Sequence, residues 1–130
     1  MTLREIVTLP DPVLRRKARA VSKFDADLQT LIDDMIETMR QAPGVGLAAP
    51  QVGVSQQVIV VEYPENDQEE GSPKKLYAMV NPEIVKPSQE TISGIEGCLS
   101  VPGLVGEVER AVELTVKGLN RRGQPMRVKV

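Results

Sequence analysis

The hydrophobic positions of this chain change their period partway along it. In residues 25–40 the apolar residues recur at helical spacing and form one stripe, which predicts a helix. Asp25 and Asp27 suit the positive end of that helix, and Pro43 and Gly44 stop it. A shorter helical turn is expected at 11–14, where an aspartate cap precedes a proline. We expect the stripe to face the core. Its members are Leu28, Leu31, Ile32, Met35, Ile36 and Met39.

Strand patterns follow the helix. Residues 58–61 form a continuous apolar run, which is typical of a buried strand, and 76–80 form a second strand ended by Asn81-Pro82. The polar stretch 64–73 is expected to be a loop. Alternating segments at 112–116 and 126–130 flank the turn 120–123 and predict a hairpin. The class is therefore α+β, with one long early helix and mostly antiparallel strands.

The last alternating segment still runs at Val130. Domains usually finish with a turn, a cap or a polar tail, so the pattern predicts a single domain over 1–130 that is cut short at its C-terminus. A short C-terminal edge strand is the alternative.

Composition narrows the possible functions. The chain has 130 residues, the length of one domain, and 41% are hydrophobic with few aromatics, which predicts an aliphatic core. A net charge of −2 gives no electrostatic reason to expect nucleic-acid binding. One cysteine cannot form an intrachain disulfide, and no apolar run approaches the roughly 20 residues of a membrane span. The N-terminus lacks the apolar run of a signal peptide. We expect a cytoplasmic protein without a membrane partner.

The segment 44–53 is framed by glycines and contains Gln51. It matches G-x-G-x-x-A, but a dinucleotide site needs a strand before this motif and a helix after it, and here the order is reversed. Glycines permit close approach of another chain, so the segment could pair with a peptide as an added strand. The amide of Gln51 could donate to a developing oxyanion. A simple helix-to-strand connection is the alternative.

Cys98 is the single cysteine, within the run 96–100, and we expect a turn at 101–103. A lone cysteine is most often a small buried residue. A cysteine nucleophile usually needs a base such as histidine, and the chain has none. A metal site needs about three protein ligands. Glu96 could be a second ligand, orient a neighbouring group, or pair with Arg110.

Together, 44–51 and 96–100 resemble the first two signature motifs of peptide deformylases, in order and at the spacing of that family. The opening 10–14 and the long helix are similar as well, so the resemblance covers essentially the whole chain. It implies an α+β deformylase fold and a hydrolase that removes the formyl group from the N-terminal methionine of nascent proteins. The implied metal is Fe²⁺, with Zn²⁺ or Ni²⁺ as substitutes.

The resemblance also implies a role for individual residues. Cys98 would be a metal ligand, and Gln51 and the backbone N–H of Leu99 would stabilise the oxyanion. The remaining residues would bind the substrate backbone or pair behind the site. They are Val45, Gly46 and Gly97 for the substrate, and Glu96 with Arg110 for the pair.

The family's third motif, His-Glu-x-x-His on a C-terminal helix, has no counterpart, because the chain contains no histidine. That motif supplies two metal ligands and the general acid/base. We therefore expect the chain as given to bind no metal and to be inactive without a complementing segment. The alternatives are a non-catalytic peptide-binding module and a truncated pseudoenzyme. Expected partners are the N-formyl-methionyl nascent peptide and, for the intact protein, the ribosome, in the bacterial cytoplasm.

Overall fold

The computed structural model describes residues 3–8, 10–42, 44–64, 74–85, 91–98, 100–111 and 115–129. Within these ranges one long helix packs on a five-stranded antiparallel sheet of order β1-β2-β3-β6-β7, and β4 and β5 form a separate two-stranded sheet. The α+β prediction is confirmed. The elements are η1 (Pro12–Arg15), α1 (Ala26–Gln41), β1 (Gly46–Ala48), η2 (Ala49–Val52), β2 (Val58–Pro64), β3 (Lys74–Ile84), β4 (Thr91–Cys98), β5 (Val101–Ala111), β6 (Thr115–Leu119) and β7 (Pro125–Lys129).

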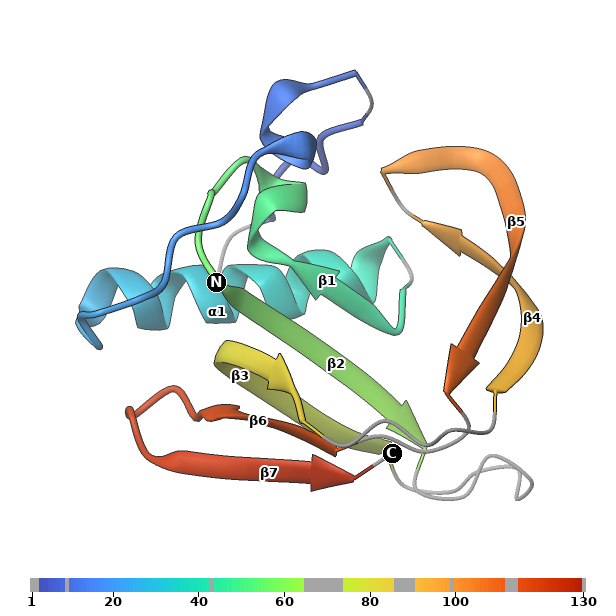
Figure 1. Ribbon diagram of the computed structural model, residues 1–130. Coiled ribbons are helices and arrows are strands. Elements are labelled where there is room, and N and C mark those ends of the chain that lie inside the picture. Colours follow the sequence, from blue (N-terminus) through green and yellow to red (C-terminus); the bar gives the residue numbers. More distant parts are fainter. Residues whose placement is uncertain are drawn as a thin grey trace.

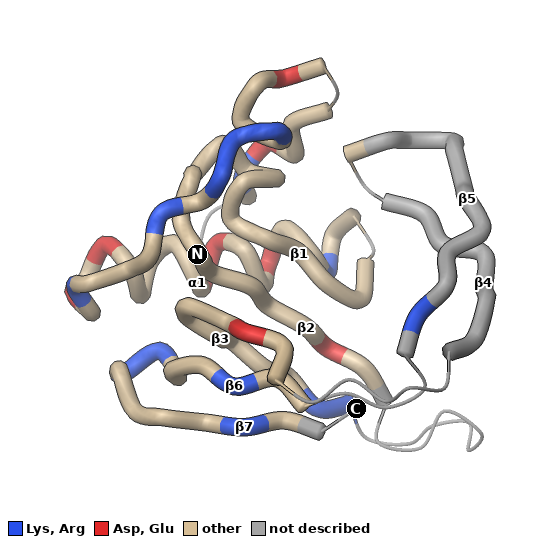
Figure 2. Tube along the Cα trace, viewed as in Figure 1, with Lys and Arg blue, Asp and Glu red and all other residues tan. Residues whose placement is uncertain are grey.

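The arrangement in space follows this division. Helix α1 crosses one face of the large sheet, and the β4–β5 hairpin stands to one side of the helix and sheet (Figure 1). Lysine and arginine occur on β6 and β7, acidic residues occur on β2 and β3, and both signs occur in the N-terminal half (Figure 2). Neither sign therefore dominates the part of the chain that the structure describes.

Helix α1 begins and ends where its sequence predicts. The side chain of Asp25 accepts a hydrogen bond from the backbone N–H of Leu28 at 3.0 Å, which satisfies one of the donors left open in the first turn. At the other end the N–H of Gly44 donates to the carbonyl of Met39 at 2.8 Å. The short helical turn is confirmed as η1, where Asp11 accepts from the N–H of Val13 at 3.0 Å.

The core lies between α1 and the sheet. The predicted apolar stripe is buried, and Ile32, Met35 and Met39 are fully enclosed. In β2 only Val58 and Val60 are fully buried, while the two residues that alternate with them are partly exposed. The continuous apolar run therefore belongs to a strand with one covered face, because α1 covers a single side of the sheet.

Strand β3 does not end at Asn81-Pro82, and that prediction is wrong. The strand continues to Ile84 through a register shift between Val80 and Glu83. Asn81 adopts φ 52°, a left-handed conformation that asparagine tolerates better than most residues. Its side chain also binds both backbone groups of Val21, at 2.7 and 2.9 Å. The bulge places Pro82 where its missing N–H breaks no regular ladder.

The β6–β7 hairpin is confirmed, with Val116 opposite Val128. Gly123 has φ 83° in the turn, and Arg121 reaches back to α1. Its Nε donates to the side chain of Gln29 and its Nη2 to that of Asp33, both at 2.7 Å. The loop predicted at 64–73 is wrong at its first residue, because Pro64 still belongs to β2 and pairs with Lys74. The rest of that loop, 65–73, and the start of the first alternating segment, 112–114, lie outside the described residues.

Candidate functional site

Strand β1 is an edge of the large sheet and carries the first glycine-framed motif. The N–H of Glu62 donates to the carbonyl of Val45 at 2.9 Å, and Gly46 lies opposite Val61. Bonded and non-bonded pairs alternate in an antiparallel ladder, so the N–H and C=O of Gly46 point away from β2. This edge therefore presents a backbone donor and acceptor to an added strand. The side chain of Val45 is 71% exposed beside it.

The side-chain amide of Gln51, in η2, has a fixed orientation. Its Oε1 accepts from the backbone N–H of Ala48 at 3.0 Å, and its Nε2 donates to Oγ of Ser100 at 3.2 Å. A backbone N–H can only donate, so the oxygen of the amide must face Ala48 and the nitrogen must face Ser100. The two motif segments, far apart in sequence, therefore meet at this amide.

The second motif occupies the end of β4 and the chain reversal into β5. The turn predicted at 101–103 is wrong, because Val101 already belongs to β5 and lies opposite Cys98. The chain reverses one position earlier, at Ser100, which is only 3% exposed. A register shift between Gly97 and Cys98 accompanies this tight reversal. Leu99 lies outside the described residues.

The pairing of β4 with β5 shows how Glu96 and Arg110 lie relative to each other along the hairpin. Glu96 lies opposite Gly106, whereas Arg110 lies opposite Ile92, four positions farther along β5. Strand residues rise by about 3.3 Å each, so the ladder does not place Glu96 and Arg110 face to face. Their pairing behind the site stays a prediction.

The residues present do not make up a metal site by themselves. Three protein ligands are the usual minimum for a catalytic metal. Among the described residues no three of His, Cys, Asp or Glu gather around one point. The sequence offers a single cysteine and no histidine. Cys98 is therefore one candidate ligand of an incomplete set.

An ion pair fixes the sheet next to the β1 edge. Nη2 of Arg40, in the last turn of α1, lies 2.6 Å from Oε2 of Glu62 in β2. The hydrogen bond from this guanidinium holds the pKa of Glu62 below its ordinary value. Because Glu62 also bonds Val45 through its backbone, the pair ties the helix end to the start of the glycine-framed segment.

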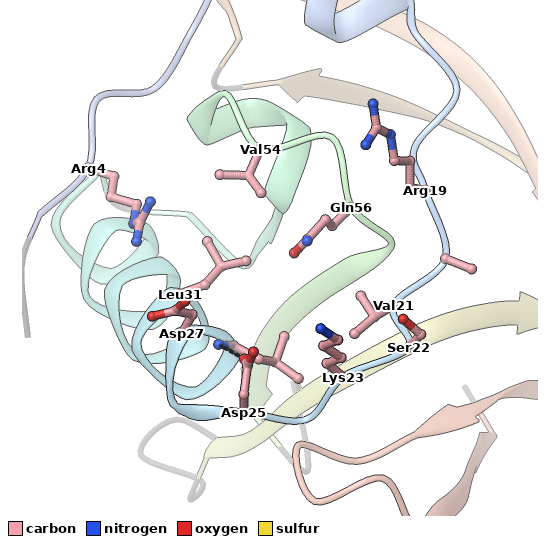
Figure 3. Close-up of a pocket in the computed structure, with 12 residues that line it drawn as sticks. Arg4, Arg19, Val21, Ser22, Lys23, Asp25, Asp27, Leu31, Val54 and Gln56 are labelled. Carbon is pink, nitrogen blue, oxygen red and sulfur yellow. Dashed lines mark hydrogen bonds between the residues drawn. The ribbon is translucent and has the colours of Figure 1, made fainter.

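A hollow of about 410 Å³ lies between the start of α1 and the segment 19–23, on residues outside both motifs (Figure 3). Charges of both signs line it. Nε of Arg4 lies 3.0 Å from Asp34, and Asp25 is engaged in capping α1. Arg19, Lys23 and Asp27 complete the charged lining. This mixture favours no one class of ligand, so we assign the hollow no function.

Two contributors to the site did not stand out in the sequence. Ala48 acts through its backbone N–H, which leaves no mark on the sequence. Ser100 shares a segment with Cys98, and that neighbourhood was the one available signal. No helix in the described ranges is long and apolar enough to cross a membrane.

The fold and site define an α+β protein with an open sheet edge beside an oriented amide donor, an arrangement suited to an extended peptide. The polypeptide deformylase family model matches residues 3–130, and the chain belongs to that family. It is 50% identical to the peptide deformylase of Dehalococcoides mccartyi (strain CBDB1) over 130 residues, covering 99% of this chain and 72% of that protein.

Solved structures agree with this assignment. The crystal structure of peptide deformylase from Thermotoga maritima superposes with a TM-score of 0.87 at 42% identity, covering 100% of this chain and 82% of that one. The Acinetobacter baumannii class I type b enzyme, with Met-Ala-Ser bound, gives 0.88 at 37% identity, covering 99% and 84%. These relatives support a deformylase hydrolase that acts in protein biosynthesis. They support neither the expectation that the chain is inactive nor the alternative of a truncated pseudoenzyme.

Proposed function

We propose that this chain binds the N-formyl-methionyl end of nascent peptides along β1 and serves in the hydrolysis of their formyl amide, in the bacterial cytoplasm. One observation carries the proposal. The Gln51 amide is bonded to Ala48 and Ser100, with its nitrogen toward the second motif, and Ala48 lies two positions along β1 from the outward-facing backbone of Gly46.

The substrate backbone would add to the edge of the sheet. Gly46 offers one N–H and one C=O, and Val45 beside it is exposed. Val45 would contact the substrate residue alongside, and the backbone of Gly97 would pair with the substrate from the hairpin. Main-chain bonds of this kind hold a peptide with little regard to its sequence. The Acinetobacter baumannii relative binds Met-Ala-Ser, a peptide that begins with methionine, which supports a peptide ligand.

Hydrolysis of the formyl amide requires stabilisation of the negative charge that develops on the formyl oxygen. Water adds to the formyl carbon, and negative charge develops on the carbonyl oxygen. The C–N bond then breaks, formate leaves, and the amine takes up a proton. Nε2 of Gln51 and the N–H of Leu99 would donate to that oxygen, in a site where such donors are worth about 10²–10³ in rate.

The family's metal would be Fe²⁺, with Zn²⁺ or Ni²⁺ as substitutes, and Cys98 would be its thiolate ligand. Glu96 and Arg110 would stand behind this ligand and orient it. The ribosome would be a further partner of the intact protein. Among the described residues, no group of three candidate ligands gathers at one point.

Peptide binding along the edge of β1 can be tested by calorimetry with formyl-Met-Ala-Ser. Gly46→Pro removes the outward N–H without breaking a bond to β2, so we expect binding to weaken about tenfold. Gly46→Ala is the control, because its Cβ would lie 3.6 Å from the carbonyl oxygen of Val60, an ordinary contact. Equal binding by both variants, or no binding by the unaltered chain, would refute pairing at this edge.

The hydrolytic role is tested by formate release in the presence of Fe²⁺. Gln51→Ala should lower kcat by about 100-fold, as expected for the loss of one oxyanion donor. Gln56→Ala removes a nearby amide that belongs to neither motif and should leave kcat unchanged. A chain that binds the peptide but releases no formate would be a peptide-binding module instead.

A further inference from the structure

We infer that residues 3–8 act as a strap that holds η2 in place, with Arg4 as the positioning residue that anchors the strap to α1. The strap belongs to no helix or strand. Arg4 bonds α1 twice, and three positions farther on the N–H of Val7 donates to the backbone carbonyl of Gln51 at 2.8 Å. The consequence for catalysis rests on the proposed function, but the consequence for the structure does not.

Helix η2 needs support from outside itself. It has four residues, a single 3₁₀ turn, and a turn of that length is not stable on its own. Within it, the N–H of Gly53 closes back on the carbonyl of Pro50 at 3.0 Å. The carbonyl of Gln51 accepts from Val7, which lies in a segment far earlier in the chain. The backbone that carries the Gln51 amide is therefore held in part by the strap.

Arg4 reaches α1 through both its backbone and its side chain. Its N–H donates to Oγ1 of Thr38 at 2.9 Å, and its Nε lies 3.0 Å from Oδ2 of Asp34. Asp34 and Thr38 are one turn apart on α1, so they lie on the same face of the helix. Figure 3 shows Arg4 beside α1, on a segment outside the helix. The strap therefore has a defined point of attachment on α1.

Burial strengthens the side-chain part of this attachment. The side chain of Asp34 is 6% exposed and that of Arg4 is 32% exposed. A carboxylate removed from water needs charged or hydrogen-bonding partners, and a hydrogen bond between opposite charges is stronger than one between neutral groups. Loss of the guanidinium would take one such partner from a buried charge. The Arg4 side chain should therefore decide how firmly the strap stays on α1.

The strap is short enough to carry this attachment to η2. Arg4 and Val7 are three positions apart, and an extended chain spans at most about 3.6 Å per residue. The two anchored residues thus leave little slack between α1 and η2. If Arg4 were released, the N–H of Val7 could move away from the carbonyl of Gln51. The backbone of Gln51 would then lose one of its restraints.

Amide hydrogen exchange in the unaltered chain and in Arg4→Met tests the strap. Methionine keeps an apolar stem but offers Asp34 no donor. We expect the protection of the Val7 amide to fall about tenfold, as for the loss of one bond to a charged group, while the amides of β2 stay within about twofold. Arg122→Met is the matched control, because Arg122 is exposed in the β6–β7 turn, and it should leave Val7 unchanged.

A conservative variant separates positioning from general loss of structure. Arg4→Lys keeps a positive charge that can lie beside Asp34, so it should restore most of the protection of Val7. Full protection of Val7 in Arg4→Met would overturn the inference. An equal loss at Val7 and in β2 would overturn it as well, because such a loss reports global unfolding. A lysine that restored nothing would also refute the role of the ion pair.

A second variant keeps the test decisive if Arg4→Met does not fold. Thr38→Val keeps the shape of the buried threonine and removes the acceptor for the N–H of Arg4. The Val7 amide should again lose protection while β2 keeps its own. Unchanged protection of Val7 in this variant would overturn the inference.

The consequence for catalysis has its own readout. In formate release with Fe²⁺, Arg4→Met should lower kcat about tenfold, less than removal of the Gln51 amide itself, and leave KM within about twofold. A rise in KM with unchanged kcat would contradict a role in positioning the oxyanion donor. If the unaltered chain releases no formate, the proposed function fails, while hydrogen exchange still decides whether the strap holds η2.

Discussion

Different kinds of contact are described at the two sheets of this molecule. Helix α1 and the large sheet share an aliphatic core, in which Ile32, Met35 and Val60 are fully buried. Among the strands described, β4 and β5 pair with each other in a sheet of their own. A polar contact, from Gln51 to Ser100, joins the tip of that hairpin to the first region. Among the contacts described, burial thus positions the first motif, and a directional bond links Ser100 of the second motif to it.

The two kinds of contact differ in how much they contribute to the stability of the chain. Truncating a buried core side chain costs about 2–5 kcal/mol, whereas one hydrogen bond contributes about 1 kcal/mol net. The link described between the two motifs is therefore worth little energy but has a strict geometry. Loss of that bond should therefore cost the chain less stability than truncation of a buried core side chain.

The largest effect should come from the shared core. Met35→Ala removes a fully buried side chain from the face of α1 that meets the sheet. We expect the free energy of unfolding to fall by about 2–5 kcal/mol, measured by urea denaturation. Met35→Leu keeps the volume and should cost less than about 1.5 kcal/mol. If Ser100→Ala proved as destabilising as Met35→Ala, the contrast between the two regions would be lost.

A smaller effect is expected where β3 and β6 approach closely. A Cβ added at Gly118 would lie 2.9 Å from the carbonyl oxygen of Val80 and 3.3 Å from Cα of Pro82. These are backbone atoms that cannot turn aside, so Gly118→Ala should destabilise the chain by about 1–3 kcal/mol. Gly46→Ala, at the sheet edge, should change stability little in the same denaturation series. A tolerant Gly118 would mean that the sheet yields more readily than its packing indicates.

The smallest effect concerns the exposed ion pair beside β1. The pKa of Glu62 is lowered, so its stabilising contribution is present above the pKa of the unfolded chain and is lost as the pH falls through the folded pKa. Half of the Arg40 side chain is exposed, which limits the gain to about 1 kcal/mol or less. The stability difference between the unaltered chain and Glu62→Gln should be present at neutral pH and shrink on acidification. A difference that grew in acid would contradict this sign.

Sequence patterns correctly predicted the elements that depend mainly on interactions between residues close together in the chain. The helix followed from its stripe and its Asp25 cap, and the β6–β7 hairpin followed from alternation around a glycine turn. The predicted end of β3 failed, because the side chain of Asn81 finds its partner in Val21, sixty positions away. The turn predicted at 101–103 was wrong, because the chain already reverses at Ser100 and Val101 belongs to β5.

The sequence alone determined which chemical groups the two motifs offer: the single thiol of the chain at Cys98, an amide at Gln51, and no imidazole. It also placed these groups in two recognisable segments, because a motif is defined by the order and spacing of its residues in the sequence. Only the tertiary structure decided that Gln51 meets Ser100 and Ala48, and that Gly46 turns its backbone outward. Such contacts depend on how the sheet edge, η2 and the hairpin pack together, and no local period encodes that packing.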